Sequence, residues 1–546
     1  MIGYQESLSG FDDLAATVIH YWSSDWGSEW TPCQQSAAIP LNIAVIAGRS
    51  SKGHHPFLII EAGERIFFLG VAWSGNWQIT INPRGSQLDI TVESESEDLE
   101  VFTTSVASGG VDLAMRNFIT QFRKSDSHQR PKLLTEWNSW WPYEDAEINE
   151  AILLENAAIA QLSGIETVVL DAGWFGPSEK NTYWHQLRGD WKIRNLERFP
   201  SGLEKIGEKI RALGIEFGIW LEIEALGESA KLATEQPDFV ARRDGKALGY
   251  LCLGNPAALV WAEKTTQDLI DECKASWLKL DFNVDPGSGC NRDDHLHKST
   301  SGLNDHINGL YQLLDTLTKN NPDLTIENCS SGGLRWDLGM AQHVDFGFAS
   351  DPDWPEHALA SFWASSLFFP VEKLLGWCDS QWRGDHPHQL FSASTSPDSD
   401  LEFSLAITLL GGFGISARLP EFSVAKERLL AEFVELYKSE FRPRYQAKAF
   451  VRHLSAQPER ELAGCRTVAF AIEAENFDPI VVIYQLEGKN YLPQIQYAPP
   501  KSLAQYRVRD LRSQEIILES SQGEFVFVNN LLSNTARILI FEKVSS

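Results

Sequence analysis

Between about residues 132 and 440 the sequence alternates short apolar runs with longer mixed segments, and this alternation constrains the fold more than any other feature. Strands separated by helical segments predict βαβ units and a parallel sheet. Eight apolar runs have the length and composition of strands. They are Leu133–Trp137, Thr167–Asp171, Glu216–Leu221, Trp277–Phe282, Leu324–Asn328, Val344–Ala349, Lys373–Trp377 and Phe413–Ala417. Eight such repeats over about 300 residues match the size of a TIM barrel, so we predict an α/β fold with a (β/α)8 barrel. Helical spacing of apolar residues in Asp145–Leu162 and Leu203–Leu213 supplies two of the helices between these strands.

On either side of the predicted barrel the chain has a β-type pattern. Short alternating apolar runs, separated by Gly, Asn and Ser, predict antiparallel sheets there. These runs are Pro56–Ile60, Arg65–Ala72 and Trp77–Ile81 before the barrel, and Thr467–Ile472, Ile480–Tyr484, Phe525–Val528 and Ala536–Phe541 after it. With a polar linker at Lys124–Pro131, we predict an N-terminal β-sandwich-like domain over residues 1–128, the barrel over 129–445 and a small C-terminal β-sandwich over 446–546.

Charge and cysteine usage exclude several classes of function. The formal net charge of −27 argues against nucleic acid and anionic membrane surfaces as partners. No run of about 18 apolar residues predicts a membrane span, and the first residues lack the pattern of a secretory signal. The seven cysteines are scattered without a Cys-x-x-Cys pair, which is typical of free thiols in a reducing compartment. We therefore expect a cytoplasmic protein.

Metal and phosphate chemistry find little support in the sequence. A zinc site needs clustered ligands, and the cysteines offer no cluster along the chain. The only two His-x-His pairs, His295–His297 and His386–His388, lie in polar stretches outside the predicted strands, so we interpret them as surface histidines. The glycine-rich stretch Ser331–Gly333 lacks the Gly-Lys-Ser/Thr ending of a phosphate loop. We expect no metal and no cofactor.

Acidic residues terminate several of the predicted strands. In a TIM barrel the carboxyl ends of the strands form one face, where catalytic groups lie. The acidic residues at these ends are Asp171, Glu222, Glu224, Asp281, Glu327 and Asp351, and the tryptophans near them are Trp137, Trp140, Trp174, Trp220 and Trp377. A single aspartate at a strand end is more often a cap, but five acidic strand ends predict an acidic, aromatic pocket. Aromatic rings and carboxylates together suit a sugar, and hydrolysis of a glycosidic bond needs two carboxyl groups.

Several motifs on these strand ends resemble glycoside hydrolase family 36, the α-galactosidases and their relatives, in the same clan as family 27. The most specific is Glu-Asn-Cys-Ser-Ser-Gly-Gly-Leu-Arg-Trp-Asp at residues 327–337, which resembles the family's Glu-Ser-Cys-Ser-Gly-Gly-Gly-Gly-Arg-Phe-Asp. Residues 170–176, 189–191, 199–203 and 218–222 are similar to other family motifs. The resemblance runs from about residue 51 to residue 440 and is strongest between Trp137 and Pro370. It implies a retaining exo-α-glycosidase, with α-galactosidase as the first expected activity.

The resemblance also assigns roles to individual residues. The family nucleophile lies in Lys-Trp-Asp-x-Asn, which matches residues 279–283 and implies Asp281 as nucleophile. The general acid/base lies in a Ser-Asp pair after the glycine-rich motif, which implies Asp351. The implied sugar-binding residues are Asp171, Trp174, Trp191, Trp220, Lys279, Asn283, Cys329, Gly332 and Arg335. We expect Lys279 to favour the ionised form of Asp281, and Asp351 to lie against aromatic surface that keeps it protonated.

Three departures from the family pattern bear on the sugar. The family's paired Asp-Asp is Asp171-Ala172 here, and two family arginines align with Val284 and Leu248. A hydrogen bond to a charged group contributes about 1.5–3 kcal/mol, so these losses can change the preferred sugar. The N-terminal β region is also shorter than in long members, although the resemblance leaves a homo-oligomer open.

Two other functions remain open at this point. The same machinery could act on another α-glycoside, such as an α-N-acetylgalactosaminide or an α-glucoside, or transfer the glycosyl group; Ala172 favours this alternative. The chain could instead be a sugar-binding protein without catalysis, which the retention of both Asp281 and Asp351 argues against.

Overall fold

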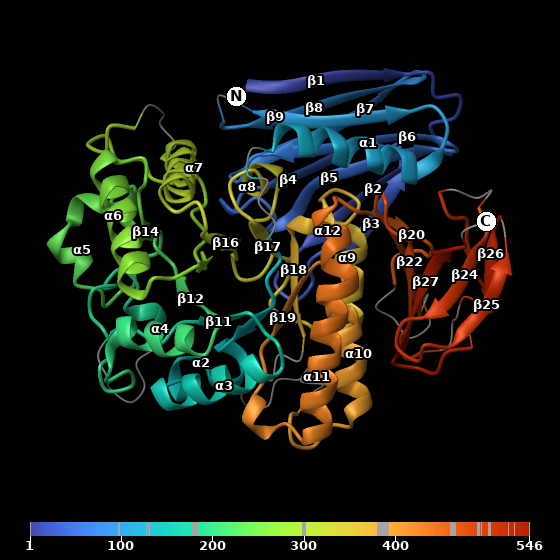
Figure 1. Cartoon of the computed structure of the whole chain (residues 1–546). Coiled ribbons are helices and arrows are strands. Elements are labelled where there is room, and N and C mark those ends of the chain that lie inside the picture. Colours follow the sequence, from blue (N-terminus) through green and yellow to red (C-terminus); the bar gives the residue numbers. More distant parts are fainter. Residues whose placement is uncertain are drawn as a thin grey trace.

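A parallel eight-stranded barrel forms the centre of the protein (Figure 1). The computed structural model describes residues 2–96, 99–126, 128, 132–176, 184–297, 302–378, 392–458, 466–488, 492, 494–500, 504–521, 523–528 and 530–544. The barrel strands, in order, are β10 (Glu136–Asn138), β11 (Thr167–Leu170), β12 (Glu216–Leu221), β15 (Trp277–Leu280), β16 (Thr325–Asn328), β17 (Phe346–Phe348), β18 (Leu374–Cys378) and β19 (Gly412–Ile415). Each strand pairs in parallel with its neighbours, and β10 closes the barrel on β19. The predicted barrel is confirmed.

The predicted strands and the observed strands differ most at the first one. We expected a strand over Leu133–Trp137, but β10 begins at Glu136. Leu133 has φ +53°, a left-handed conformation that an extended strand cannot contain. The backbone therefore turns at Leu133 and becomes extended only three residues later.

Helices cover the outside of the barrel. The long ones are α3 (Glu150–Leu162), α4 (Gly202–Ala212), α6 (Pro256–Cys273), α7 (Gly302–Asn320), α9 (Pro355–Ser365), α10 (Asp398–Thr408) and α11 (Val424–Leu436). Shorter helical segments are α2 (Trp140–Glu147), α5 (Leu232–Glu235), α8 (Leu338–Ala341), α12 (Arg442–Gln446), the 3-10 turns η1 (Trp184–Gln186), η2 (Pro237–Phe239), η3 (Val371–Lys373) and η4 (Leu419–Glu421), and a π-helical turn, η5 (Tyr437–Phe441). A hairpin of β13 (Val240–Arg243) and β14 (Lys246–Leu251) projects from the loop after β12.

The predicted helix Asp145–Leu162 is two helices. Asn149 breaks it, because its side chain accepts hydrogen bonds from the backbone N–H groups of Ala151 and Ile152 and so caps α3. Glu144, with φ +45°, also interrupts α2. The second predicted helix, Leu203–Leu213, agrees with α4 to within one residue.

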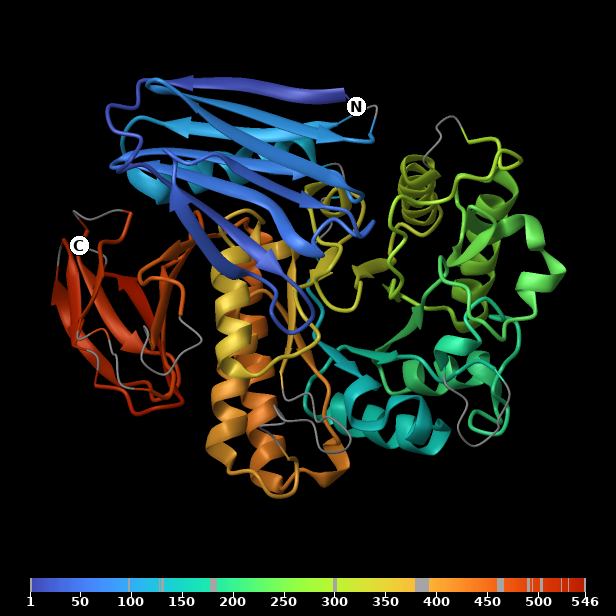
Figure 2. The same ribbon diagram turned by 180° about the vertical axis from the view of Figure 1, so that it is seen from behind.

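The N-terminal region forms two antiparallel sheets. Their strands are β1 (Ile2–Ser9), β2 (Val18–Ser24), β3 (Thr31–Ser36), β4 (Leu41–Val45), β5 (Gly53–Ala62), β6 (Arg65–Ala72), β7 (Trp77–Arg84), β8 (Gln87–Ser94) and β9 (Glu100–Val106), ordered β1-β8-β7-β4 and β3-β2-β5-β6-β9. Both sheets contribute to one apolar core, and Phe57 of β5 stacks on Phe368 of the barrel at 4.5 Å between ring centroids. The β2–β3 end of these sheets reaches down to the barrel (Figure 2).

The sequence pattern missed helix α1 (Gly110–Ser125), which packs on β6 and β9. Its buried face includes Ala114, Phe118 and Phe122, which recur every four residues. The predicted linker Lys124–Pro131 overlaps the end of this helix, since Lys124 and Ser125 are helical. Residues 127 and 129–131 of that prediction lie outside the described residues.

The C-terminal region is a further β structure beside the barrel. Its strands are β20 (Phe450–His453), β21 (Thr467–Glu473), β22 (Ile480–Gln485), β23 (Gln494–Tyr497), β24 (Tyr506–Asp510), β25 (Ile516–Ser521), β26 (Phe525–Val528) and β27 (Thr535–Lys543). Six of them form one sheet, and β23 and β26 form a second that shares its apolar core. Tyr484 ties this region to α10 by donating its hydroxyl hydrogen to the carbonyl of Ala406 at 2.7 Å.

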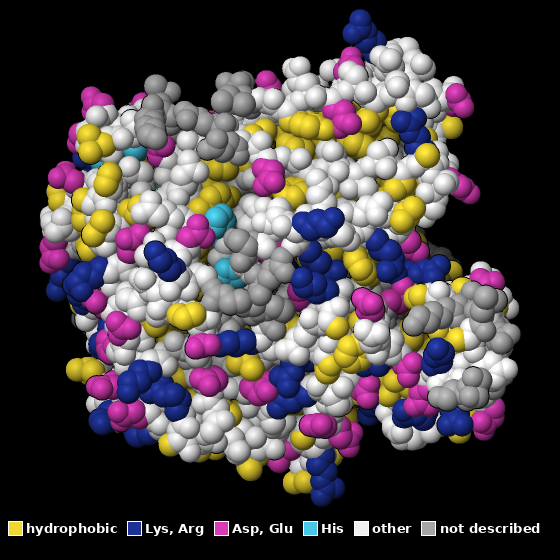
Figure 3. All heavy atoms as spheres, turned by 45° about the horizontal axis from the view of Figure 1, so that its top comes forward, with side chains coloured by type: hydrophobic (Ala, Val, Ile, Leu, Met, Phe, Trp, Pro, Cys, Tyr) yellow, Lys and Arg dark blue, Asp and Glu magenta, His cyan; other side chains and the backbone are white. Residues whose placement is uncertain are grey.

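The surface is mixed in charge. On the face seen in Figure 3, acidic side chains are scattered, while several Lys and Arg side chains lie near the notch between the N-terminal and C-terminal sheets. A cleft there, lined by Arg116, Lys124, Lys448 and Lys543 among others, has a volume of about 760 Å³. Among the described residues, no helix has both the length and the apolar character needed to span a membrane.

Candidate active site

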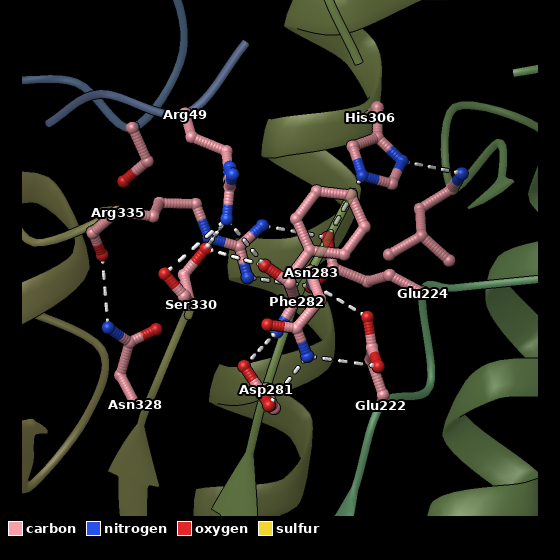
Figure 4. A network of polar contacts seen from close by, with 12 residues as sticks. Arg49, Glu222, Glu224, Asp281, Phe282, Asn283, His306, Asn328, Ser330 and Arg335 are labelled. Atoms are coloured by element: carbon pink, nitrogen blue, oxygen red, sulfur yellow. Dashed lines mark hydrogen bonds and ion pairs between the residues drawn. The ribbon is translucent and has the colours of Figure 1, made fainter. Parts of the chain in front are cut away.

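The carboxyl ends of the barrel strands bring the predicted acidic residues to one face. Asp171 follows β11, Glu222 and Glu224 follow β12, Asp281 follows β15, and Asp351 lies shortly after β17. The resulting polar network around Asp281 is shown in Figure 4.

Four hydrogen-bond donors converge on the carboxylate of Asp281. Oδ2 accepts from Asn283 Nδ2 at 2.7 Å and from Trp220 Nε1 at 3.3 Å. Oδ1 accepts from the backbone N–H groups of Phe282 at 2.8 Å and of Ser331 at 3.3 Å. Every one of these contacts is a donor, so the setting matches an ionised, oriented carboxylate, as a nucleophile requires.

The surroundings of Asp351 favour its protonated form, in contrast to those of Asp281. Burial, followed by the negative charge of Asp281, raises the pKa of Asp351 to about 7. Trp26 donates its indole N–H to Oδ2 of Asp351 at 2.9 Å, which opposes the increase. As a whole residue, Asp351 is half-buried. A carboxylic acid that holds its proton near neutral pH is suited to general acid catalysis.

The glycine-rich loop after β16 connects the two aspartates. Gly332 has φ +74°, and a Cβ atom there would lie 2.5 Å from the backbone nitrogen of Asp351. At Gly333 a Cβ would lie 2.2 Å from the carbonyl oxygen of Ala349. The residue before Gly332 is Ser331, whose backbone N–H donates to the carboxylate of Asp281. This one loop therefore contacts both Asp281 and the backbone of Asp351. Its glycines are required for a close approach of backbone to backbone.

A known protein family matches the segment that contains the barrel and these motifs. A protein-family model described as Melibiase matches residues 101–445. The chain belongs to the melibiase family. The predicted resemblance to glycoside hydrolase family 36 is thereby confirmed.

Among curated relatives of this melibiase-family chain, Alpha-galactosidase AgaA of Geobacillus stearothermophilus is 24% identical over 344 residues, covering 61% of the chain and 44% of that protein. Alpha-galactosidase C of Emericella nidulans is 29% identical over 313 residues, covering 54% of the chain and 38% of that protein. The chain thus spans less than half the length of each. The crystal structure of GH36 alpha-galactosidase AgaA from Geobacillus stearothermophilus shares the fold, with a TM-score of 0.82 at 18% identity, over 99% of this chain and 76% of that one.

Lys279 pairs with Asp171 and not with Asp281. Its Nζ lies 2.8 Å from Asp171 Oδ2, which also accepts from Asn138 Nδ2 at 3.1 Å. Burial lowers the pKa of Lys279, but the negative charge of Asp171 and other nearby acidic groups raises it well above its usual value. Lys279 also lies 4.2 Å from the ring centroid of Trp377. Asp281 is among the acidic groups that raise the pKa of Lys279, but the direct partner of the lysine in this melibiase-family chain is Asp171. The expected effect of Lys279 on Asp281 stays a prediction.

The three predicted sugar-binding tryptophans form one buried group. Trp220 donates to Asp281, and Trp174 donates its indole N–H to the carbonyl of Trp220 at 3.0 Å. Trp174 and Trp191 are fully covered by protein, with ring centroids 6.1 Å apart. Trp220 is equally buried, at 1% exposure, and its ring centroid lies 6.2 Å from that of Trp191. Trp174 and Trp191 therefore support the residue that donates to Asp281, and their role in sugar binding stays a prediction. Trp184, which the motifs did not identify, contacts the Trp220 ring at 5.3 Å and is only half-buried.

Arg335 is also a supporting residue. Its guanidinium group binds both carboxylate oxygens of Glu224, at 3.0 and 2.7 Å, and lies 4.6 Å from the ring centroid of Phe282. Burial alone would raise the pKa of Glu224, but Arg335 and His306 lower it to about 2. Because both terminal nitrogens of Arg335 are engaged, the residue fixes Phe282, next to Asp281, and does not extend toward a sugar as predicted.

Glu222 binds Asn283, the residue whose side chain donates a hydrogen bond to Asp281. It accepts from the backbone N–H of Asn283 at 2.6 Å and from Arg188 at 2.8 Å. Burial raises the pKa of Glu222 to about 7, with Arg188 opposing and Asp281 reinforcing the increase. Asn283 itself bonds Asp281, as the motif implies. Cys329, predicted to line the subsite, is buried, and burial followed by the charges of Asp281 and Asp351 raises the pKa of its thiol.

The N-terminal sheets contribute residues that no barrel motif identifies. Trp26, between β2 and β3, bonds Asp351. Arg49, after β4, donates to the carbonyl of Phe282 at 3.3 Å and to the hydroxyl of Ser331 at 3.0 Å. Glu29 accepts from the hydroxyl of Ser350 at 3.0 Å. These side chains come from another domain, so only the folded chain reveals them.

The three departures from the family pattern fall into two places. Ala172 is buried directly beside Asp171, whose carboxylate accepts the Ala172 backbone N–H at 2.8 Å. Leu248 and Val284, which replace family arginines, are half-buried and pack against the same apolar cluster, which contains Phe282. This edge of the site is therefore apolar.

The predictions for the histidine pairs and cysteines need correction. His295 is 1% exposed, so it is not a surface residue, and its ring centroid lies 5.3 Å from that of His297. Cys252 and Cys290, remote in sequence, lie beside these histidines, so the cysteines do form a cluster with potential metal ligands. His386 and His388 lie outside the described residues.

Proposed function

We propose that this chain is a retaining exo-α-glycosidase, with terminal α-linked galactose as substrate, Asp281 as nucleophile and Asp351 as general acid/base. The observation that carries the proposal is the contrast between the two aspartates. Asp281 accepts four hydrogen bonds, whereas Asp351 has a pKa raised to about 7. Family membership and the names of the relatives support the choice of reaction and sugar.

The proposed reaction has two steps. In the first, Asp351 gives its proton to the glycosidic oxygen while Asp281 Oδ attacks the anomeric carbon, so that the leaving alcohol departs and a glycosyl ester forms on Asp281. In the second, the Asp351 carboxylate takes a proton from water, whose oxygen attacks the anomeric carbon and releases Asp281. Two inversions give retention. No cofactor takes part in either step.

The electrostatic effect of Asp281 on Asp351 supports this exchange of roles. The negative charge of Asp281 helps to raise the pKa of Asp351. Formation of the glycosyl ester removes that charge, so the pKa of Asp351 falls when its carboxylate must accept a proton. Lys279 and Asp171, joined at 2.8 Å, provide a cation and an anion near the site that can bind sugar hydroxyls.

A second candidate function is the same mechanism on another α-glycoside or in glycosyl transfer. Three observations favour it: Ala172 in place of an acidic residue, and Leu248 with Val284 in one apolar edge where the family has arginines. A doubly substituted variant of AgaA has been crystallised in complex with raffinose, yet these changes are reasons to test the sugar directly. A sugar-binding role without catalysis is the third candidate, and the intact pair of aspartates argues against it.

Two further features stay proposals. A cytoplasmic location is supported by the six described cysteines, all of which are free thiols. A homo-oligomer remains open, and size-exclusion chromatography with light scattering would establish the mass in solution.

The test of the reaction and the sugar is a panel of aryl α-glycosides, hydrolysed by the natural sequence and by Asp281→Ala in parallel. We expect preference for the α-galactoside, and a loss of at least about 10⁴-fold in kcat for the variant. Activity on a different glycoside alone would favour the second candidate. Equal low rates for both proteins on every member of the panel would favour the third.

A further inference from the structure

Four potential metal ligands meet beside the active-site loops. They are the thiols of Cys252 and Cys290 and the imidazoles of His295 and His297, and their ligand atoms all lie within 4.8 Å of one another. Sγ of Cys252 lies 2.9 Å from Nε2 of His297, and Sγ of Cys290 lies 3.6 Å from Nδ1 of His295. Among the described residues this is the only such group.

The spacing of these atoms approaches that of a tetrahedral zinc site. With Zn–S of about 2.3 Å and Zn–N of about 2.0–2.1 Å, neighbouring ligand atoms stand about 3.4–3.8 Å apart. The Cys290–His295 distance already falls in that range, and the Cys252–His297 pair would open by roughly 0.7 Å to admit the ion. Two thiolates with two imidazoles favour zinc over calcium or magnesium, which prefer oxygen ligands.

The surroundings are those of a closed structural site. Cys252 and Cys290 are fully buried and share an apolar cluster with Ala241, Tyr250 and Phe282. The backbone N–H of Arg242 lies 3.4 Å from Cys290 Sγ, which is the kind of donor that stabilises a metal-bound thiolate. Four protein ligands in such a pocket leave no position for a substrate.

Two glycines leave room for the His297 ring. A Cβ at Gly302 would lie 2.6 Å from His297 Cε1, and a Cβ at Gly254 would lie 3.0 Å from its Cδ2. Both positions therefore allow the imidazole to lie against the backbone with Nε2 toward Cys252.

We propose that Cys252, Cys290, His295 Nδ1 and His297 Nε2 bind one structural zinc ion. The ion would join two segments that are separate in sequence: the end of the β13–β14 hairpin, which carries Cys252, and the loop that runs from Asp281 to His297. Phe282, next to Asp281, belongs to the apolar cluster around the cysteines. The ion therefore stabilises the segment that positions the proposed nucleophile, without taking part in the sugar chemistry.

A second connection leads from the same segment to the active site. The backbone N–H of Leu253, next to Cys252, donates to His306 Nδ1 at 3.1 Å, and His306 Nε2 lies 2.9 Å from Glu224, the partner of Arg335 (Figure 4). The hairpin end is thereby fixed both by the proposed ion and by this histidine.

The experiment measures metal content directly, independently of any activity. The full chain and its variants are purified under reducing conditions from zinc-supplemented cells and analysed by plasma mass spectrometry. We expect about one zinc per chain, released on titration with a mercurial thiol reagent, and a decrease of roughly tenfold in Cys290→Ser and His297→Ala. Cys273→Ser is the matched control, because Cys273 is equally buried but lies on α6 outside the group, and it is expected to retain its zinc.

A second measurement does not depend on the folding of any variant. Replacement of the ion by Co²⁺ in the natural sequence is expected to give sulfur-to-cobalt charge-transfer absorption and the intense d–d bands of a tetrahedral site. A chain that neither contains zinc nor takes up zinc or cobalt would overturn the proposal, as would a Cys252–Cys290 disulfide found by mass spectrometry. Either result leaves the two-aspartate mechanism untouched.

Discussion

Trp26 of the N-terminal sheets donates its indole N–H to Oδ2 of Asp351 at 2.9 Å, across the boundary with the barrel. A domain outside the barrel thus contributes to the environment of the proposed general acid. The hydrogen bond favours the ionised form of Asp351 and opposes the burial that raises its pKa to about 7.

This contact predicts a pH effect of Trp26→Phe. The acid must be protonated in the first step, so the basic limb of kcat/KM follows the pKa of Asp351 and is expected near pH 7. Removing a donor that lowers this pKa moves the basic limb to higher pH, by up to about one unit. Trp184→Phe, a change at a tryptophan whose ring contacts that of Trp220, serves as the control and should leave the limb in place. A shift to lower pH would contradict the assignment of Asp351.

Gly332→Ala is expected to separate the two aspartates from their common loop. A Cβ at this position meets the backbone nitrogen of Asp351 at 2.5 Å, and φ of +74° adds strain. A displacement of about 1 Å can cost on the order of 10²-fold in rate, so we predict a loss of that size in kcat. Gly376→Ala provides the comparison, since no atom lies within 4 Å of its Cβ position and it should retain normal turnover. Equal kinetics for the two variants would show that the loop does not position Asp351.

Arg335→Met tests whether Arg335 acts as a buried partner of Glu224. Loss of the arginine leaves a buried carboxylate with only His306, so we expect the free energy of unfolding at neutral pH to fall by about 3 kcal/mol or more. The pKa of Glu224 is depressed to about 2, so its stabilisation is present above its unfolded pKa and is lost as the pH falls toward 2. The deficit of the variant should therefore shrink in acid, as denaturant titrations at several pH values can establish. Arg507→Met, at an exposed pair with Glu519, should change stability by less than about 1 kcal/mol.

Ala172→Asp tests the basis of sugar preference. The substitution restores the family's paired aspartates beside Asp171 and adds an acceptor for a sugar hydroxyl. If Ala172 sets the preference, the ratio of kcat/KM for the α-galactoside to that for other α-glycosides rises, by about tenfold for one hydrogen bond to a charged group. An unchanged ratio would mean that Leu248 and Val284, or other residues, decide the sugar.

The sequence predicted the barrel because its strands are short, apolar and regularly separated, as at Glu216–Leu221, where the predicted and observed bounds coincide. Positions that depend on a local backbone conformation were not predictable: the left-handed Leu133 delays β10. Motif resemblance identified Asp281 and Asp351, and both lie where a barrel places catalytic groups.

The site residues that the sequence did not predict depend on contacts between remote segments of the chain. Trp26 and Arg49 reach the site from the N-terminal sheets, and the approach of Cys252 to Cys290 depends on how the hairpin folds over the loop. A motif also gives residue identity without contacts, so the hydrogen bond that Trp174 donates to the carbonyl of Trp220 is seen only in the structure.

The most direct test of the two-aspartate mechanism is azide rescue of Asp281→Ala, with the anomeric configuration of the product followed by NMR. Azide fits the space left by the missing carboxylate and attacks from the same side. The account predicts almost no turnover without azide, and with azide a β-glycosyl azide, inverted relative to the α-glycoside substrate. A rescued product of retained configuration would contradict Asp281 as the nucleophile.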